Sequence, residues 1–194
     1  ASVKISPVGA SPISAMPMEA PMALEWQVDV WLNTRAPLEL SQLRGRAVLL
    51  HAFQMLCPGC VSHAVPQAER VHQEYAEHGV SVIGLHTVFE HHAAMMPVAL
   101  EAFLHEYRVT HPVGVDVAVA GISIPATMRR YGMQGTPTLI LIDRAGKLRH
   151  GLTFEAVLRD LGDTLAFGFV RREPVAPPAP PSGSATRRCA ASWA

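Results

Sequence analysis

Short apolar runs alternate with amphipathic stretches through the central part of the chain. The run at residues 46–53 is almost wholly apolar, which is typical of a strand buried on both faces of a sheet. A second run, at residues 80–85, is rich in β-branched side chains. Together with weaker runs, these patterns predict strands at residues 25–31, 46–53, 80–85, 113–117, 138–142 and 147–150, the last two joined as a hairpin.

Helical periodicity separates these strands. Residues 58–78 predict a helix that ends at Gly79, with a kink at Pro66 because proline has no N–H to donate. Apolar positions at i, i+3, i+4 and i+7 predict another helix that starts near residue 97. Shorter helices are expected at residues 123–131 and 154–165. The alternation predicts an α/β domain whose mixed sheet is covered by helices on both faces.

The two ends of the chain lack this periodicity. Residues 1–24 are rich in proline, alanine, serine and methionine and are expected to be a flexible segment. Residues 173–194 are expected to be a disordered, proline-rich tail. One domain is therefore predicted at residues 25–172, which is long enough to bury a sizeable core.

Composition narrows the classes of function. The formal net charge is +0, so no electrostatic footprint for nucleic acid or an anionic membrane is visible. No apolar run approaches the roughly 18 residues that a membrane span needs. The 3 cysteines exclude a disulfide-rich scaffold and fit a cytoplasmic redox protein, or a periplasmic one if an upstream signal has been removed. Cys189 is expected to be a free thiol in the tail.

The chemistry is expected at Cys57-Pro58-Gly59-Cys60, which follows an apolar strand and opens a helix. A helix N-terminus favours negative charge, so the first sulfur is more easily ionised there. Because the thiolate is the nucleophile of disulfide exchange, this placement indicates a redox-active pair rather than a structural bridge. No cofactor is expected.

With these features the chain resembles the thioredoxin-like superfamily, and more closely its TlpA/ResA-like thiol-disulfide oxidoreductases, with similarity to redoxins and peroxiredoxins. The shared features are the strand-CxxC-helix unit, the segment Gly135-Thr136-Pro137-Thr138 before a strand, the hairpin at residues 141–147 and the segment at residues 43–46. The resemblance covers about residues 26–168 and includes a helical insertion before the loop that holds Pro137. It implies a thioredoxin-like fold.

The resemblance also implies roles for individual residues. Pro137 would be cis and lie against the CxxC, and the backbone of Thr136 would pair with a substrate chain as an added strand. Together with Pro58 and Gly59, these residues form the expected substrate-binding site. Cys57 would attack the disulfide, and Cys60 would resolve the mixed disulfide. The expected partners are protein or small-molecule disulfides and thiols, with an electron donor that the sequence does not identify.

Several residues depart from the family pattern. Family members usually carry tryptophan at the positions of Phe53 and Leu56, so a different surface is expected beside the first sulfur. His51 takes the place of the aspartate that accepts a proton in thioredoxins, and His63 takes the place of a glutamate in ResA-like members. Either histidine could exchange the proton of Cys60. The alternatives are a core histidine bonded to backbone for His51 and a plain helix-surface residue for His63.

Three other functions are alternatives to disulfide exchange. A peroxidase of the peroxiredoxin type needs a Pro-x-x-x-Thr-x-x-Cys motif, but Leu50 and Gln54 occupy its proline and threonine positions. A zinc or copper site could use Cys57, Cys60, His51 and His63, or the histidines at positions 86, 91 and 92. A non-catalytic interaction domain is disfavoured because both sulfurs are present.

Overall fold

A six-stranded mixed sheet forms the centre of the protein, for which a computed structural model describes residues 20–149. The order across the sheet is β1-β4-β3-β2-β5-β6. The β2–β3 and β3–β4 pairs are parallel, while β1–β4, β2–β5 and β5–β6 are antiparallel. The strands are β1 (Val28–Leu32), β2 (Ala47–Phe53), β3 (Val80–His86), β4 (Val113–Asp116), β5 (Thr138–Ile142) and β6 (Leu148–Arg149). The predicted mixed sheet is confirmed.

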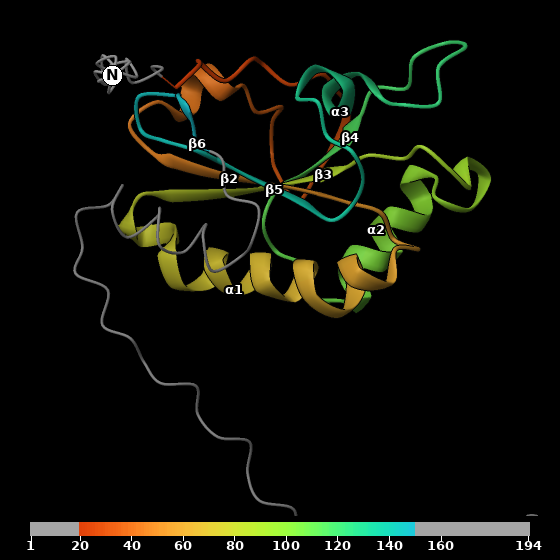
Figure 1. The fold of residues 1–194 in the computed structure, drawn as a ribbon. Helices are drawn as coiled ribbons and strands as arrows, with labels where there is room; N and C mark the ends of the chain where they lie inside the picture. Colours follow the sequence, from red (N-terminus) through yellow and green to blue (C-terminus); the bar gives the residue numbers. More distant parts are fainter. Residues whose placement is uncertain (1–19, 150–194) are drawn as a thin grey trace, which may run out of the picture.

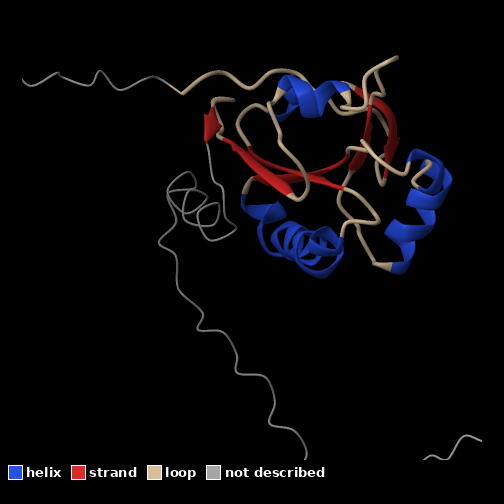
Figure 2. Cartoon of the chain, turned by 45° about the vertical axis from the view of Figure 1, so that its right-hand side comes forward, coloured by secondary structure: helices blue, strands red, loops and turns tan. Residues whose placement is uncertain are grey.

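Helices cover both faces of this sheet (Figures 1 and 2). The helices α1 (Val65–Tyr75) and α2 (Pro97–Glu106) lie on one side, and α3 (Ala126–Arg130) lies on the other. Short 3-10 turns occur at Leu40–Leu43, Ala76–His78 and His92–Ala94. Gly79 ends the α1 segment with a φ of 84°, a left-handed conformation that glycine adopts without steric cost, as predicted.

The strand β2 lies at the centre of both core layers, and all seven of its residues are buried. Leu49 packs with Ala68 and Val71 of α1 on one face. Leu50 packs with Leu40 and Met128 on the other. Because successive side chains of a strand point to opposite faces, His51 and Phe53 lie on the α1 side with Leu49. This register places a histidine in the layer that also receives the CxxC.

The first strand differs from its prediction, since it spans Val28–Leu32 instead of residues 25–31. Trp26 is buried in the core, and its indole N–H donates to the carbonyl oxygen of Leu38 over 2.7 Å. The side chain thus contributes to the core from an irregular segment, a placement that apolar content alone does not distinguish from a strand.

The start of the folded part also differs from the predicted boundary at residue 25. Met22 forms a bridge with Lys147, and the N–H of Ala23 donates to the carbonyl oxygen of Gly146 over 2.8 Å. Ala23 is buried. The end of the segment expected to be flexible therefore packs on the β5–β6 hairpin. The rest of that segment, the helix predicted at residues 154–165 and the tail lie outside the described residues.

Smaller differences concern the lengths of three elements. The third helix, α3, is shorter than the predicted 123–131, because Pro125 precedes it as its N-cap. The strand β4 ends at Asp116, and β6 spans only Leu148–Arg149 within the described residues. Among the helices of residues 20–149, none combines the length and the apolar character that crossing a membrane requires.

Candidate active site

The two cysteines of the CxxC lie where β2 meets the helix that follows it. After β2, the chain turns at residues 54–57, and the N–H of Cys57 donates to the carbonyl oxygen of Gln54 over 3.2 Å. Pro58 and Gly59 are already helical. The sulfurs of Cys57 and Cys60 lie at disulfide distance, with Cα atoms 5.2 Å apart. The predicted redox-active pair is therefore formed.

The two sulfurs occupy different environments. Cys60 is 0% exposed and packs among apolar side chains, whereas Cys57 is half-buried. The N–H of Cys60 donates to the sulfur of Cys57 over 3.2 Å. A donor at this position stabilises negative charge on the outer sulfur. A substrate in solvent can therefore reach Cys57 but not Cys60.

The loop before β5 lies against the outer sulfur. The peptide bond between Thr136 and Pro137 is cis, as expected. The carbonyl oxygen of Thr136 lies 3.5 Å from the sulfur of Cys57. A Cβ atom built on Gly59 would lie 3.6 Å from the Cδ atom of Pro137, so the two residues are close neighbours. The structure thus brings together five of the predicted site residues, namely Cys57, Gly59, Cys60, Thr136 and Pro137.

The kink expected at Pro66 takes the form of a π-helical turn at Cys60–Ala64. Pro66 has no N–H for the carbonyl of Ser62, and its ring would clash with that carbonyl in a regular α-helix. The turn widens instead, and the N–H of Val65 donates to the carbonyl oxygen of Cys60. Such turns are frequent at functional sites. Here the wide turn begins at the buried sulfur itself.

His51 lies in the buried layer beneath the CxxC helix. Its ring stacks on Phe53 with centroids 4.9 Å apart, and Phe53 belongs to the same apolar cluster as Cys60. Neither ring nitrogen has a hydrogen-bond partner among the described residues, so the alternative of a backbone-bonded histidine is wrong. Burial, together with the charge of nearby His111, lowers the pKa of His51 well below its usual value.

The other predicted histidine is His63, and the two positions where family members carry tryptophan are Phe53 and Leu56. These three residues differ in their exposure and contacts. His63 is exposed, and its Nδ1 atom lies 2.6 Å from the hydroxyl oxygen of Ser62 rather than against a sulfur. Leu56 is 56% exposed beside Cys57, but Phe53 is only 1% exposed. The expected change of surface therefore comes from Leu56 alone, because Phe53 points into the core.

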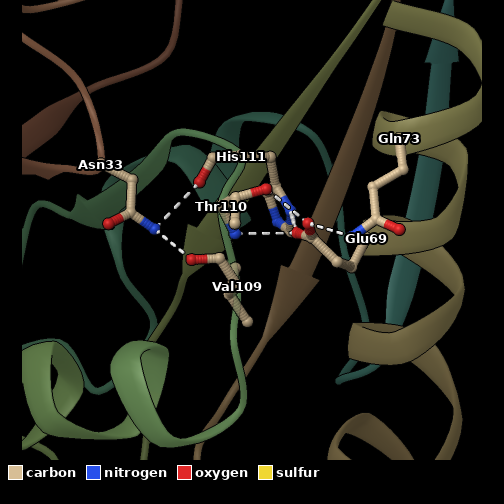
Figure 3. A network of polar contacts seen from close by, with 6 residues as sticks. All are labelled: Asn33, Glu69, Gln73, Val109, Thr110 and His111. Carbon is tan, nitrogen blue, oxygen red and sulfur yellow. Dashed lines mark hydrogen bonds and ion pairs between the residues drawn. The ribbon is translucent and has the colours of Figure 1, made fainter.

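A polar network on the same face was not predicted from the sequence (Figure 3). The carboxylate of Glu69, on α1, accepts hydrogen bonds from the N–H of Thr110 at 2.9 Å, from the amide of Gln73 at 3.0 Å and from the Thr110 hydroxyl. It also lies 2.8 Å from the Nδ1 atom of His111. Asn33 holds this segment from the other side through the carbonyl oxygens of Val109 and His111.

One feature of the sequence indicates part of this network, namely polar residues on the apolar stripe of α1. The inward stripe of α1 follows the spacing i, i+3, i+4, i+7 from Val65, and the last two of these places hold Glu69 and His72. Charged or polar residues on an apolar stripe indicate buried partners. The partner itself, His111, lies 42 positions further along the chain, and no local pattern marks it.

Burial and hydrogen bonding determine the pKa values of the titratable side chains in this layer, and for Glu69 they act in opposite directions. Burial alone would raise the pKa of Glu69, but hydrogen bonds from His111, Thr110 and Gln73 outweigh it and hold the pKa far below its usual value. Neither ring nitrogen of His86 has a hydrogen-bond partner within residues 20–149, and burial lowers the pKa of His86 to about 4. Glu69 is therefore an anion and His86 a neutral ring near neutral pH.

The alternative functions gain no support from this geometry. Within residues 20–149, no group of three or more histidine, cysteine, aspartate or glutamate side chains is placed to hold a metal ion. His86 is buried in β3, whereas His91 and His92 are exposed. At the position where a peroxidase needs a threonine hydroxyl, the structure has the buried amide of Gln54.

The fold, the paired sulfurs and the cis-proline loop define a thioredoxin-fold thiol-disulfide oxidoreductase. The model of the Redoxin family matches residues 30–156, which is more than half of the chain. The chain belongs to this family.

Solved structures and curated proteins agree with this assignment. A crystal structure of a thioredoxin-like superfamily protein is 46% identical, covers 76% of this chain and 97% of its own, and has a TM-score of 0.71. A thiol-disulfide isomerase from Corynebacterium glutamicum is also 46% identical, with coverages of 77% and 98% and a TM-score of 0.70. The thiol-disulfide oxidoreductase ResA of Halalkalibacterium halodurans is 28% identical over 111 residues, 57% of this chain and 56% of ResA.

The curated relatives are longer than the matched region. Protein DipZ of Mycobacterium tuberculosis is 30% identical over 122 residues, which are 62% of this chain and 16% of DipZ. The chain therefore matches about half the length of ResA and a smaller share of DipZ.

Proposed function

We propose that the protein exchanges electrons with protein disulfides through Cys57 as the attacking sulfur and Cys60 as the resolving one. The observation that carries this assignment is the unequal exposure of the two sulfurs, half-buried for Cys57 and 0% exposed for Cys60. The sulfur that meets the substrate must be reachable, and the resolving sulfur needs to reach only its neighbour. The N–H of Cys60 and the helix start stabilise the thiolate of Cys57.

We further propose that an extended substrate segment binds along Thr136, beside Pro137, Pro58 and Gly59. The strand β5 begins only at Thr138, so Thr136 precedes the ladder, and its carbonyl lies 3.5 Å from the outer sulfur. A short chain that pairs with this backbone would bring its own disulfide to Cys57. The exposed Leu56 offers an apolar contact on the same side.

His51 is proposed to accept the proton that Cys60 loses. Its ring belongs to the buried strand β2, and it stacks on Phe53, which is part of the cluster that contains Cys60. Its pKa, lowered by burial, keeps the ring neutral near neutral pH and therefore able to accept. His63 has no such contact, and we assign it no role in the proton transfer.

Cysteine variants test the roles of the two sulfurs. In a Cys189→Ser background, which removes the third cysteine of the chain, we expect Cys57→Ser to abolish reduction of a model disulfide, since a substrate in solvent does not reach Cys60. Cys60→Ser should instead accumulate a mixed disulfide on Cys57, visible as a mass increase by intact-protein mass spectrometry. Turnover that survives Cys57→Ser would refute the assignment, and so would a Cys60→Ser protein that releases its substrate as fast as the wild type.

A further inference from the structure

Two buried imidazoles lie next to each other beneath the CxxC helix. The rings of His51 and His111 have centroids 5.7 Å apart. In the sheet register His51 is paired with Gly84 of β3, and a Cβ atom built on Gly84 would lie 3.3 Å from the Nε2 atom of His111. The imidazole of His111 therefore lies over the backbone of Gly84, where a larger residue would hold it away from His51.

The Glu69 carboxylate determines which nitrogen of His111 carries a proton. A carboxylate accepts hydrogen bonds, so the Nδ1 atom of His111, 2.8 Å away, must donate. The Nε2 atom is buried and has no partner among the described residues. A proton that arrives at Nε2 creates an imidazolium whose charge Glu69 balances directly. In the described structure His51 has no such counter-ion, and burial lowers its pKa.

Other titratable groups around this pair are few. From α1, His72 also approaches, with its ring centroid 5.9 Å from that of His111, and the charge of Glu69 acts on it as well. The neighbouring strands present Gly84 and Leu139 opposite His51, and Phe53 covers its ring. Glu69 is therefore the counter-ion that faces the buried imidazoles.

We propose that His111, oriented by Glu69, stores the proton that Cys60 loses through His51 during resolution of the mixed disulfide. The proposal rests on the function proposed above. The thiol of Cys60 gives its proton to His51, which passes one on to the Nε2 atom of His111, and the Cys60 sulfur bonds to the sulfur of Cys57. The bond between Cys57 and the substrate breaks, and the substrate sulfur leaves with that electron pair. His111 then returns the proton to the leaving thiolate by way of solvent, so that the substrate disulfide is the only oxidant.

Glu69 and His111 are positioning residues in this scheme, because they act through His51 and touch no sulfur. The experiment uses the reduced full chain with Cys189→Ser as background, so that Cys57 and Cys60 are its only thiols. The substrate is an aromatic disulfide, 5,5′-dithiobis(2-nitrobenzoate), which releases one coloured thiolate at each step. The first release depends on reagent concentration and reports Cys57. The second is independent of it and reports resolution by Cys60. Both rates are measured between about pH 5 and pH 9, a range that spans the unperturbed histidine and cysteine values.

We expect Glu69→Gln and His111→Gln to slow the second release roughly tenfold at neutral pH and to move its midpoint about one unit towards the value of a free thiol. The first release should not change. His51→Leu, which removes the intermediate carrier, should give the same result. The matched controls are Glu74→Gln, which removes a carboxylate from the exposed side of the same helix, and His105→Gln on α2; both should follow the wild type.

The outcomes separate the two proposals. A wild-type second release that Cys60→Ser leaves intact would refute the disulfide mechanism itself. A second release that depends on Cys60, but whose pH profile is the same in wild type, Glu69→Gln and His111→Gln, would refute only the proton store.

A measurement on the wild type keeps the test decisive if a variant does not fold. Imidazole nitrogen NMR should show the neutral ring of His111 with its proton on Nδ1, because the Glu69 carboxylate accepts a hydrogen bond from that atom. A neutral His111 ring with its proton on Nε2 would overturn the inference, because that nitrogen could then not receive a proton from His51.

Discussion

Gly84 is the residue whose missing side chain allows the buried histidines to meet, and Gly84→Ala tests that packing directly. A Cβ atom at this position would lie 2.9 Å from the Cγ2 atom of Val113, 3.3 Å from Nε2 of His111 and 3.4 Å from Cε1 of Phe53. Val113 is fully buried on the next strand and branched at Cβ, so it has little freedom to move away. The imidazole is the neighbour that can shift.

The expected change in the free energy of unfolding for Gly84→Ala follows from two opposing effects. An extra methyl group in a close-packed core costs about 1–3 kcal/mol. Alanine is intrinsically better than glycine within a strand by roughly 0.5–1 kcal/mol, which offsets part of that cost. We therefore expect Gly84→Ala to lower the free energy of unfolding by about 1–2 kcal/mol, which for a urea m-value near 1.5 kcal/mol/M moves the midpoint down by about 1 M.

Urea unfolding followed by circular dichroism measures this change, and two other glycines serve as controls. Gly114→Ala would bring Cβ to 2.7 Å from a methyl carbon of Val28, so it should also destabilise the protein, but without disturbing the Cys60 step. Gly135 has no atom within 4 Å of a built Cβ, and Gly135→Ala should leave the midpoint unchanged or slightly higher. A Gly84→Ala protein as stable as the wild type, with normal second-step kinetics, would show that His111 needs no such opening.

Two further predictions concern acid stability and partner choice. The pKa of His86 is lowered to about 4 by burial, so the unfolded chain binds more protons than the folded one between about pH 6.5 and pH 4, and stability falls as the pH falls through that window. His86→Leu should remove about 2 kcal/mol of the stability loss between about pH 7 and pH 5, measured by urea unfolding at both values; an equal loss in both proteins would contradict this. Leu56→Ser should raise the KM for a peptide disulfide while leaving stability within about 0.5 kcal/mol and the rate with a small aromatic disulfide unchanged, whereas equal effects on both substrates would argue against a docking contact.

Much of the fold can be predicted from the sequence because many of its elements are specified by short local motifs. The CxxC after an apolar strand, the glycine that ends α1 and the threonine-proline pair before β5 each specify a conformation through a few neighbouring residues. The polar network is different, because Glu69 and His111 meet across 42 positions and neither carries a local motif. Phe53 illustrates the same limit of local sequence. Its position in the family pattern predicts a surface residue beside the first sulfur, but the strand register places its side chain in the core.

The two sulfurs are therefore governed by different parts of the molecule. Around Cys57 lie exposed or backbone groups, namely Leu56, the carbonyl of Thr136 and the N–H of Cys60, which determine what can approach it. Cys60 is 0% exposed, and in the proposed scheme its proton leaves through the buried layer on the same face of the sheet. Because the exposed groups beside Cys57 are separate from the buried histidines, surface substitutions should alter substrate preference without altering the pH profile, and substitutions at the buried histidines should do the opposite. A variant that moved both together would show that substrate binding and proton transfer are coupled through the CxxC helix itself.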